Sequence, residues 1–287
     1  MVSSLAGVLF DGFAYGMLLF LLSVGLSVTL GMMNFVNLAH CSFAMVGGYT
    51  TVTLVNKMGW PYLATLPMAF VAAALVSIPL ERIFFRRLYR ASDLDQCLLT
   101  IGVVFISIAA FAWFYTTDQQ SAPLPAFLQG SIHAGGMSFS VYRIFLIVMS
   151  LAITLLLVFL LEKTRFGAQV RAAVDNQRMA RGLGIDVDRA FMITFALGAG
   201  LAGLGGALAI QVVGLDPTFA LAYLVYVLIV VSVGGLGSIA GSFAAAMVLG
   251  ISDMAGKYYF PWLGAFLIYL VMVALLMWRP VGLFGRR

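Results

Sequence analysis

Charged side chains are scarce in this sequence. Only 9% of its 287 residues are Asp, Glu, Lys or Arg, whereas 63% are hydrophobic, and the mean hydropathy is +1.06. A soluble protein of this length would cover its core with far more charge. The composition therefore excludes a soluble globular protein and indicates a polytopic membrane protein.

Cysteine and histidine are also rare, with two residues of each kind. Cys41 and Cys97 make no disulfide framework, and His40 and His133 lie far apart in the sequence. We therefore predict no metal site and no nucleophilic triad. The phosphate-binding pattern GxxxxGKS/T is missing as well. We expect a protein that is not an enzyme, needs no cofactor and does not hydrolyse ATP by itself.

Acidic side chains are missing from the interiors of the apolar segments. All Asp and Glu residues except Asp11 fall at the edges of these segments. Secondary transporters and proton pumps usually place a coupling carboxylate inside the helix bundle. The pattern argues against a transporter driven by an ion gradient and suggests that a partner protein supplies the energy for transport. The alternative is a secondary transporter or channel that works without ATPases.

What the sequence does have is long apolar runs, most of which approach the roughly 20 residues of a spanning helix. Two of them, 41–55 and 242–251, are short and predict half helices or re-entrant segments. The predicted fold is an all-α polytopic membrane protein with about eight or nine hydrophobic segments in one domain, 1–287. The runs are 13–30, 41–55, 60–80, 98–115, 144–161, 191–213, 219–233, 242–251 and 258–278.

Basic residues gather in three places, and this placement explains the net charge of +5 without a nucleic-acid partner. By the positive-inside rule these places are cytoplasmic, including the C-terminus. The loop 116–140 has no Lys or Arg and is predicted on the opposite side. The side of the N-terminus is undetermined. The basic groups are Arg82 to Arg90, Lys163 to Arg189, and Arg279, Arg286 and Arg287.

Two regions interrupt the apolar pattern without adding charge. In the first, Asn34, Asn37 and His40 recur every three residues and would share one face of a helix. Such side chains are tolerated at membrane depth against protein or along a water-filled path, so a substrate path and a hydrogen-bonded helix contact are both open. The second, GGLGSIAG at 234–241, predicts a broken helix or tight turn that lines a cavity.

Short sequence similarities suggest two related halves, 1–140 and 141–287. HCSFAMVGG in the first half resembles GSFAAAMVLG in the second, and internal repeats are common in transporters. Small residues at three- and four-residue spacing within 195–209 predict a close helix-packing face. These are Gly198, Ala202, Gly205, Gly206 and Ala209.

The charged loop 162–189 stands between two apolar runs. Residues 165–180 predict one amphipathic helix that Gly182 and Gly184 end, and Asp186 or Asp188 is expected to cap the next helix. The loop either docks a partner or is an ordinary interfacial loop. Its predicted apolar stripe is Phe166, Val170, Ala173, Val174 and Met179.

Five ordered segments resemble the permeases of the branched-chain amino acid ABC importer family. EKTRFG followed by RAAVDNQRMARGLGIDVDRA resembles their cytoplasmic coupling loop. NFVNLAH with MVGGY, ERIFFRRLYR, GGLGSIAG and the terminal RPVGLFG resemble further signatures in the same order. The resemblance covers essentially the whole chain and is closest to the shorter of the two permease subunits.

This resemblance implies an importer in the bacterial inner membrane. The chain would be one of two permease subunits in contact with membrane lipid, with two cytoplasmic ATPases and a periplasmic substrate-binding protein as partners. Many relatives follow the histidine with Gly-Glu, whereas this chain has Cys41 and Ser42. The substrate is therefore open among branched-chain amino acids, urea or short amides, and aromatic or other carboxylic acids.

The resemblance also implies roles for two groups of residues. The coupling group would dock on an ATPase: Arg165, Phe166, Gly167, Arg171, Ala172, Asn176, Met179, Ala180 and Gly184. The path group would lie near the translocation path: Asn34, Asn37, His40, Ser42, Gly234, Gly235, Gly237, Ser238 and Gly241.

Overall fold

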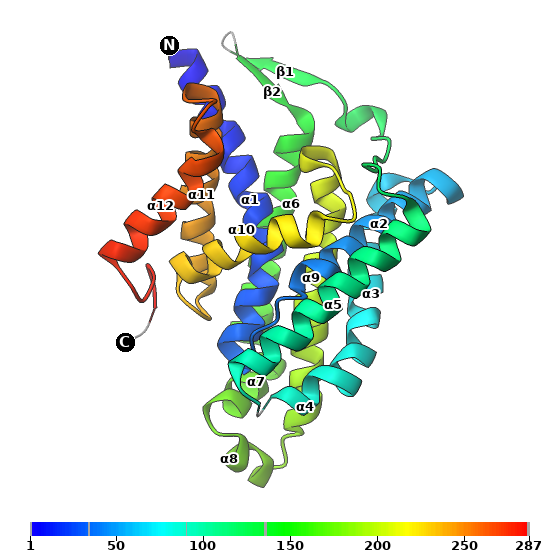
Figure 1. Cartoon of the computed structure of the whole chain (residues 1–287), viewed down its shortest axis with the longest axis vertical. Helices are drawn as coiled ribbons and strands as arrows, with labels where there is room; N and C mark the ends of the chain where they lie inside the picture. The colour runs from blue at the N-terminus through cyan, green and yellow to red at the C-terminus, as the bar shows by residue number, and fades with distance from the viewer. Residues whose placement is uncertain (1, 34, 90, 135–136, 286–287) are drawn as a thin grey trace.

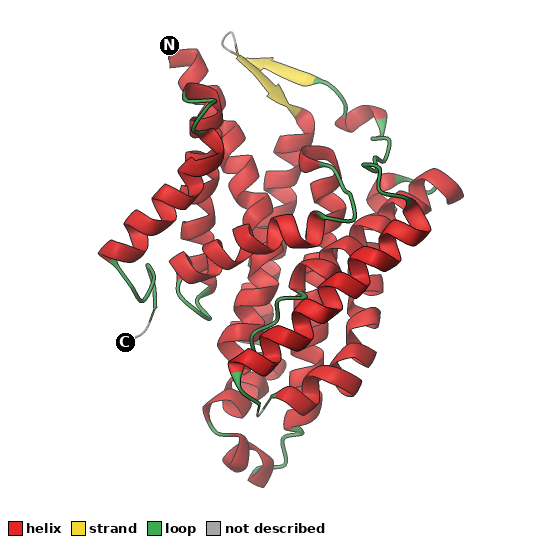
Figure 2. Ribbon diagram, viewed as in Figure 1, coloured by secondary structure: helices red, strands yellow, loops and turns green. Residues whose placement is uncertain are grey.

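The computed structural model describes residues 2–33, 35–89, 91–134 and 137–285, and it consists of helices joined by loops, with one short hairpin (Figure 2). The first half contains α1 (Val2–Met33), α2 (His40–Met58), α3 (Tyr62–Leu80), the π-helical turn η1 (Glu81–Phe85), α4 (Arg86–Leu88) and α5 (Asp93–Tyr115). The 3-10 turn η2 (Ala126–Leu128) precedes the antiparallel strands β1 (Ser131–Ala134) and β2 (Met137–Ser140), with Ser131 paired to Ser140.

The second half begins with α6 (Val141–Lys163), the short helices α7 (Arg165–Asp175) and α8 (Gln177–Gly182), and the long α9 (Val187–Val213). It ends with α10 (Phe219–Gly234), α11 (Ile239–Tyr259) and α12 (Gly264–Trp278). Within the described residues, six helices are long and apolar enough to cross a membrane, and α10 and α12 are shorter apolar helices. An all-α polytopic class is confirmed, whereas the count of eight or nine segments and the internal repeat stay predictions.

The structure corrects the boundaries of the last apolar runs. The run 242–251 was expected to be short, but α11 continues through it to Tyr259 and is 21 residues long. Asp253 and Gly256, which end the run in a hydropathy reading, are buried inside this helix. The chain turns instead at 260–263, so that α12 has only 15 residues.

The molecule has two distinct ends (Figure 1). The β1–β2 hairpin and the start of α1 lie at one end, which we call the hairpin end, and α7 and α8 lie at the other, the α7–α8 end. An ion pair between Asp11 and Arg143 holds α1 against the start of α6, and an edge-to-face contact of the Phe10 and Phe139 rings, 4.9 Å apart, holds it against the hairpin. The structure thus places the N-terminal part of α1 with the loop 116–140.

α1 and α9 form the centre of the bundle. In their most apolar windows 89% and 78% of the residues are buried, against 11% in α5, which therefore lies at the periphery. α1 packs on α11 and α9, while α9 also packs on α2 and α3. The predicted packing face on α9 is confirmed, because Gly198 faces the backbone of Gly25 and Gly206 faces that of Ala44. Lipid supplies no hydrophobic force between helices, so such close contacts hold the bundle together.

We predict that Gly206→Val destabilises the folded protein, because a side chain at this position would collide with the backbone of α2 at Ala44. Overpacking of this kind costs about 1–3 kcal/mol or more when backbone blocks the new atoms. The measurement is the apparent Tm of the purified protein in detergent. Gly102→Val in α5 is the matched control, since its side chain would enter open space. Equal Tm values for the two variants would contradict the packing argument.

Candidate functional site

α7 and α8 are two helices, and the prediction of a single helix over 165–180 is wrong. Asn176 interrupts it with an extended backbone, φ −154°. Its side-chain oxygen accepts a hydrogen bond from the Met179 amide at 3.0 Å and so caps α8. Asparagine favours this position because its short side chain satisfies an amide that has no partner within the helix. The chain therefore changes direction at Asn176.

α7 is fixed to the end of α6. Thr164 caps α7 by accepting a hydrogen bond from the Gly167 amide at 3.3 Å, and any side chain at Gly167 would collide with the backbone of Leu161. The Arg171 guanidinium donates to the Leu161 carbonyl, one of the carbonyls that a helix C-terminus leaves without a partner. Gly167 and Arg171 thus join α7 rigidly to α6.

The predicted apolar stripe is divided between two directions. Val170 and Ala173 are buried against the bundle, whereas Met179 on α8 is 64% exposed. Leu183, which follows α8, is 77% exposed. Sequence reasoning did not single out Leu183 because it lies beyond the glycine expected to end the helix, although its spacing of four from Met179 would have found it. We call Met179 and Leu183 the apolar tip.

The end of α8 confirms the predicted stop. Gly184 has φ +82°, a backbone conformation that favours glycine, and the Ile185 amide donates to the Ala180 carbonyl at 3.0 Å. This reversal keeps Ala180 buried. It also leads the chain directly into α9, whose first turn is capped by Asp186, the side chain of which accepts from the Arg189 amide at 3.0 Å. Of the two predicted caps, Asp186 is the one used.

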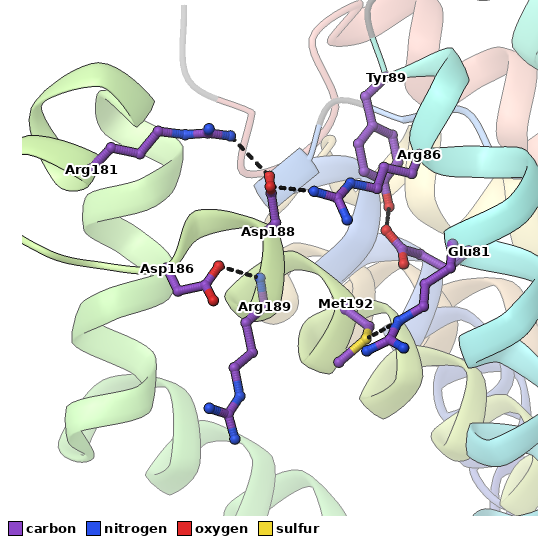
Figure 3. A network of polar contacts seen from close by, with 9 residues as sticks. Glu81, Arg86, Tyr89, Arg181, Asp186, Asp188, Arg189 and Met192 are labelled. Atoms are coloured by element: carbon purple, nitrogen blue, oxygen red, sulfur yellow. Dashed lines mark hydrogen bonds and ion pairs between the residues drawn. The ribbon is translucent and has the colours of Figure 1, made fainter.

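Asp188 connects three elements (Figure 3). Its carboxylate, at the start of α9, accepts from Arg181 of α8 at 2.8 Å and also pairs with Arg86 of α4. All three side chains are about half exposed, so each pair contributes modestly to stability. These two ion pairs matter mainly because they fix the position of α8 relative to both α4 and α9. Sequence reasoning assigned these arginines only to membrane topology.

Behind this junction, the Tyr89 hydroxyl donates to the buried carboxylate of Glu81 at 2.7 Å (Figure 3). Burial, together with the hydrogen bond to Glu81, raises the pKa of Tyr89 well above its ordinary value. The phenol therefore remains a hydrogen-bond donor at neutral pH. The Arg82 guanidinium contacts the sulfur of Met192 at 3.2 Å. The end of α3 and the start of α9 are thus joined by polar contacts.

A groove of about 570 Å³ separates α7 from the glycine-rich turn between α10 and α11. Arg171 and Val174 line it on one side, Leu236 and Gly237 on the other, and Phe284 of the C-terminal segment completes it. The segment 234–241 therefore lies at the α7–α8 end and borders a surface groove. Its predicted role in the translocation path stays a prediction.

For 234–241 the sequence predicted either a broken helix or a tight turn, and the structure shows a tight turn. Gly235 and Gly237 have φ values of +96° and +78°, and Ser238 caps α11 by accepting from the Gly241 amide at 3.0 Å. The C-terminal segment adds to it, because the Leu283 and Phe284 amides donate to the carbonyls of Val233 and Gly234 at 2.7 and 3.1 Å. The described part of the C-terminal segment is therefore held against the end of α10.

The predicted polar face of 34–40 is not a helix face. Asn34 lies outside the described residues, and 35–39 is irregular because the Asn37 side chain accepts from the nearby Ala39 amide at 3.1 Å. Side-chain bonds of this kind compete with the helix. His40 begins α2, and its Nε2 donates to the Leu22 carbonyl at 3.0 Å.

Both Asn37 and His40 are 1% exposed, and Ser42, 4% exposed, lies 2.8 Å from the Ser107 hydroxyl. In this structure all three side chains make hydrogen bonds inside the chain. Those of His40 and Ser42 join α2 to α1 and α5, as the helix-contact alternative predicted, whereas that of Asn37 is local. Their part in a translocation path stays a prediction.

Besides Glu81, the structure buries a second acid, Asp253, which the sequence placed beyond the end of an apolar run. Asp253 is 0% exposed inside α11 and pairs with Lys257 one turn later. Hydropathy does not show this burial, because the predicted apolar run ends at residue 251, before the charged Asp253. The argument against ion coupling from acid placement stays a prediction, and Asp253 is an acid buried inside a helix that it did not anticipate.

Together, the bundle of apolar helices and the projecting helix pair define a multi-pass helical membrane protein. The chain matches the family described as branched-chain amino acid transport system / permease component over residues 8–276, and it belongs to this family. It is 28% identical to the probable branched-chain amino acid transport permease protein LivH of Methanocaldococcus jannaschii, covering 94% of this chain and 90% of that protein.

Two further relatives bear on the subunit type. The high-affinity branched-chain amino acid transport system permease protein BraD of Pseudomonas aeruginosa is 24% identical over 97% of this chain and 95% of its own length. The high-affinity branched-chain amino acid transport system permease protein LivM of Escherichia coli (strain K12) is 26% identical over 93% of this chain and 68% of its own length. No solved structure is significantly similar to the chain.

The turn between α10 and α11 generates a prediction. Gly237→Val should abolish assembly or strongly reduce the yield of folded permease, because its positive φ and its contact with the backbone of Gly31 both exclude a side chain. Ser238→Ala, the matched neighbour, loses only a cap worth about 1 kcal/mol. Size-exclusion chromatography of the detergent extract measures the difference. Equal tolerance of the two changes would show that the turn is a spacer.

Proposed function

We propose that this chain is a transmembrane permease subunit of a binding-protein-dependent ABC importer, forming the translocation path for branched-chain amino acids or a related small polar or carboxylate-bearing solute. The observation that carries the proposal is the apolar tip. Met179 and Leu183 are exposed at the far end of the molecule on a helix pair that is fixed to the spans (Figure 1). A soluble partner that covers this tip can move the bundle.

The tip suits a groove on a cytoplasmic ATPase. An amphipathic helix docks in a groove through a few apolar anchors, and anchors contribute far more than surrounding exposed charges. Phe166, Ala172 and Asn176 position the two helices around these anchors, while Arg165 and Arg178 lie at the exposed rim. Gly167, Arg171, Ala180 and Gly184 act within the chain by fixing the pair to the bundle.

Movement of the α7–α8 pair has two routes into the spans. Asp188 joins α8 to α4 and α9, and the contact of Gly167 and Arg171 with Leu161 joins α7 to α6. Packed elements transmit displacement because interiors are dense and deform little. Hydrolysis on an ATPase can therefore reorient several helices together.

The charge distribution supports an orientation. The α7–α8 end carries the basic groups at 82–87 and 163–189, and the hairpin end carries the loop without Lys or Arg. We place the α7–α8 end and the C-terminus in the cytoplasm and the hairpin end, with the N-terminus, in the periplasm of the bacterial inner membrane. The periplasmic binding protein would deliver substrate at the hairpin end.

A second permease subunit completes the assembly. Relatives named LivH and LivM are both similar to this chain, which suits a heterodimer of two homologous permeases. The exposed apolar residues of α5 and α6 provide surfaces for this subunit and for lipid. Asn37, His40, Ser42 and the 234–241 turn are the candidate path residues. An ATPase-independent secondary transporter is the second candidate, favoured only by the buried Asp253.

The coupling assignment predicts the effect of polar residues at the tip. Met179→Asp with Leu183→Asp should detach the ATPases or uncouple hydrolysis from uptake, because a buried apolar anchor costs about 2 kcal/mol or more when lost. Arg178→Ala, an exposed neighbour, should be largely tolerated. ATPase retention on the purified permease and ATP-dependent uptake in vesicles are the measurements. Normal retention and uptake by the double variant would refute the docking assignment.

The orientation predicts which sites an impermeant thiol reagent reaches in right-side-out vesicles. In a background without Cys41 and Cys97, Ser131→Cys should be labelled from outside, because it lies exposed in the hairpin. Gln177→Cys, exposed on α8, should react only after the vesicles are permeabilised. Labelling of position 177 from outside would contradict the proposed orientation and indicate the opposite one.

A further inference from the structure

The buried acid Asp253 is only half satisfied. Its Oδ2 accepts from Lys257 Nζ at 2.5 Å, but within the part of the chain that the structure describes its Oδ1 is buried and has no hydrogen-bond partner. Leaving a buried charged oxygen without a donor costs free energy. If the Asp253–Lys257 ion pair served only to stabilise the fold, a second donor to Asp253 would make the fold more stable. The vacant oxygen points to a group that is supplied from outside the chain.

Aromatic side chains of neighbouring helices lie near the Asp253–Lys257 pair of α11. Tyr15 of α1 lies beside Lys257, and Tyr223 and Tyr226 come from α10, which packs on α11, with their ring centroids 5.7 Å apart. Tyr269 of α12 extends the group, with its ring centroid 6.3 Å from that of Tyr226. Aromatic faces attract cations and also cover apolar side chains. The surroundings of Asp253 therefore combine one negative charge with a wall of rings.

The cluster contains its own positive charge and reaches the surface of the chain. The Lys257 side chain is 49% exposed, and its Nζ lies 5.4 Å from the centre of the Tyr15 ring. Tyr269 is 36% exposed. A long, flexible lysine can leave Oδ2 while its ammonium stays near water. Asp253 and Lys257 thus present opposite charges side by side, buried on one side and open on the other.

We propose that Asp253 and Lys257 are the recognition site for the ammonium and carboxylate of a zwitterionic α-amino acid, with the tyrosine rings against its apolar side chain. The Asp253 carboxylate accepts the substrate ammonium and Lys257 donates to the substrate carboxylate, so both charges keep a partner in the membrane. This assignment rests on the proposed function. It also supplies the carboxylate that the sequence lacks after His40.

The test is ATP-driven uptake of L-leucine by the complete importer in proteoliposomes. Asp253→Asn should lower uptake at least tenfold, as expected for losing one charge-assisted contact, while ATPase retention and basal hydrolysis stay unchanged. Asp11→Asn, which breaks the ion pair with Arg143 at the same end of the bundle, is the matched control and should stay within about twofold. Normal uptake by an assembled Asp253→Asn importer would overturn the proposal.

A double variant separates recognition from a merely structural ion pair. Asp253→Asn with Lys257→Met removes both charges, so a structural role predicts that uptake recovers relative to either single variant. Recognition predicts that uptake stays at least tenfold low although the complex assembles. Recovery in the double variant would therefore overturn the proposal.

A third measurement leaves Asp253 intact in case its variants fail to assemble. Tyr258→Cys changes an exposed residue beside Lys257, leaves both charges in place, and can be labelled by an impermeant thiol reagent in a background without Cys41 and Cys97. During ATP turnover with the binding protein, leucine should slow labelling severalfold relative to turnover without leucine. An unchanged rate would overturn the proposal. A wild-type importer that hydrolyses ATP but takes up no leucine would instead refute the substrate of the proposed function.

Discussion

The structure depends on how closely two central helices approach their neighbours. α1 and α9 meet where Gly25 faces Gly198, and α2 lies on α9 where Gly47 faces Gly203. In a bilayer the lipid tails are as apolar as leucine, so helices associate through van der Waals contact over short distances. The small residues make these contacts possible, and the larger apolar side chains are then free to fill the core or to face lipid.

This close packing also gives the α7–α8 pair something rigid to act on. Gly167 rests on the backbone of α6, and Asp188 joins α8 to α4 and α9. Individually these surface contacts are weak. Together they connect the apolar tip to the long helices, and the tight α10–α11 turn lies across a groove from α7.

Polar groups inside the bundle follow two different patterns. His40 is fully buried and has a hydrogen-bond partner within the chain, as membrane-embedded polar groups require. Asp253 is equally buried, but among the described residues only one of its two carboxylate oxygens has a partner. The first pattern stabilises a helix contact, whereas the second retains a charge whose cost calls for a functional reason. This difference, and not polarity as such, marks Asp253 as the residue of interest.

Local signals in the sequence determined much of this protein. Apolar runs specified a helical membrane protein, the charged loop 162–189 marked the projecting segment, and Gly184 and Asp186 marked where α8 stops and α9 starts, because caps and stops depend on neighbouring residues. Ordered motifs also indicated the family, which the comparison over residues 8–276 confirms.

Only the tertiary structure decided the remaining features. The break at Asn176 and the exposure of Leu183 depend on how α7 packs against α6. The passage of α11 through Asp253 depends on Lys257 and on the helices that surround it. Hydropathy assigns each residue one preference regardless of its partners, whereas burial of a charge or exposure of a leucine is settled by contacts between segments far apart in the chain.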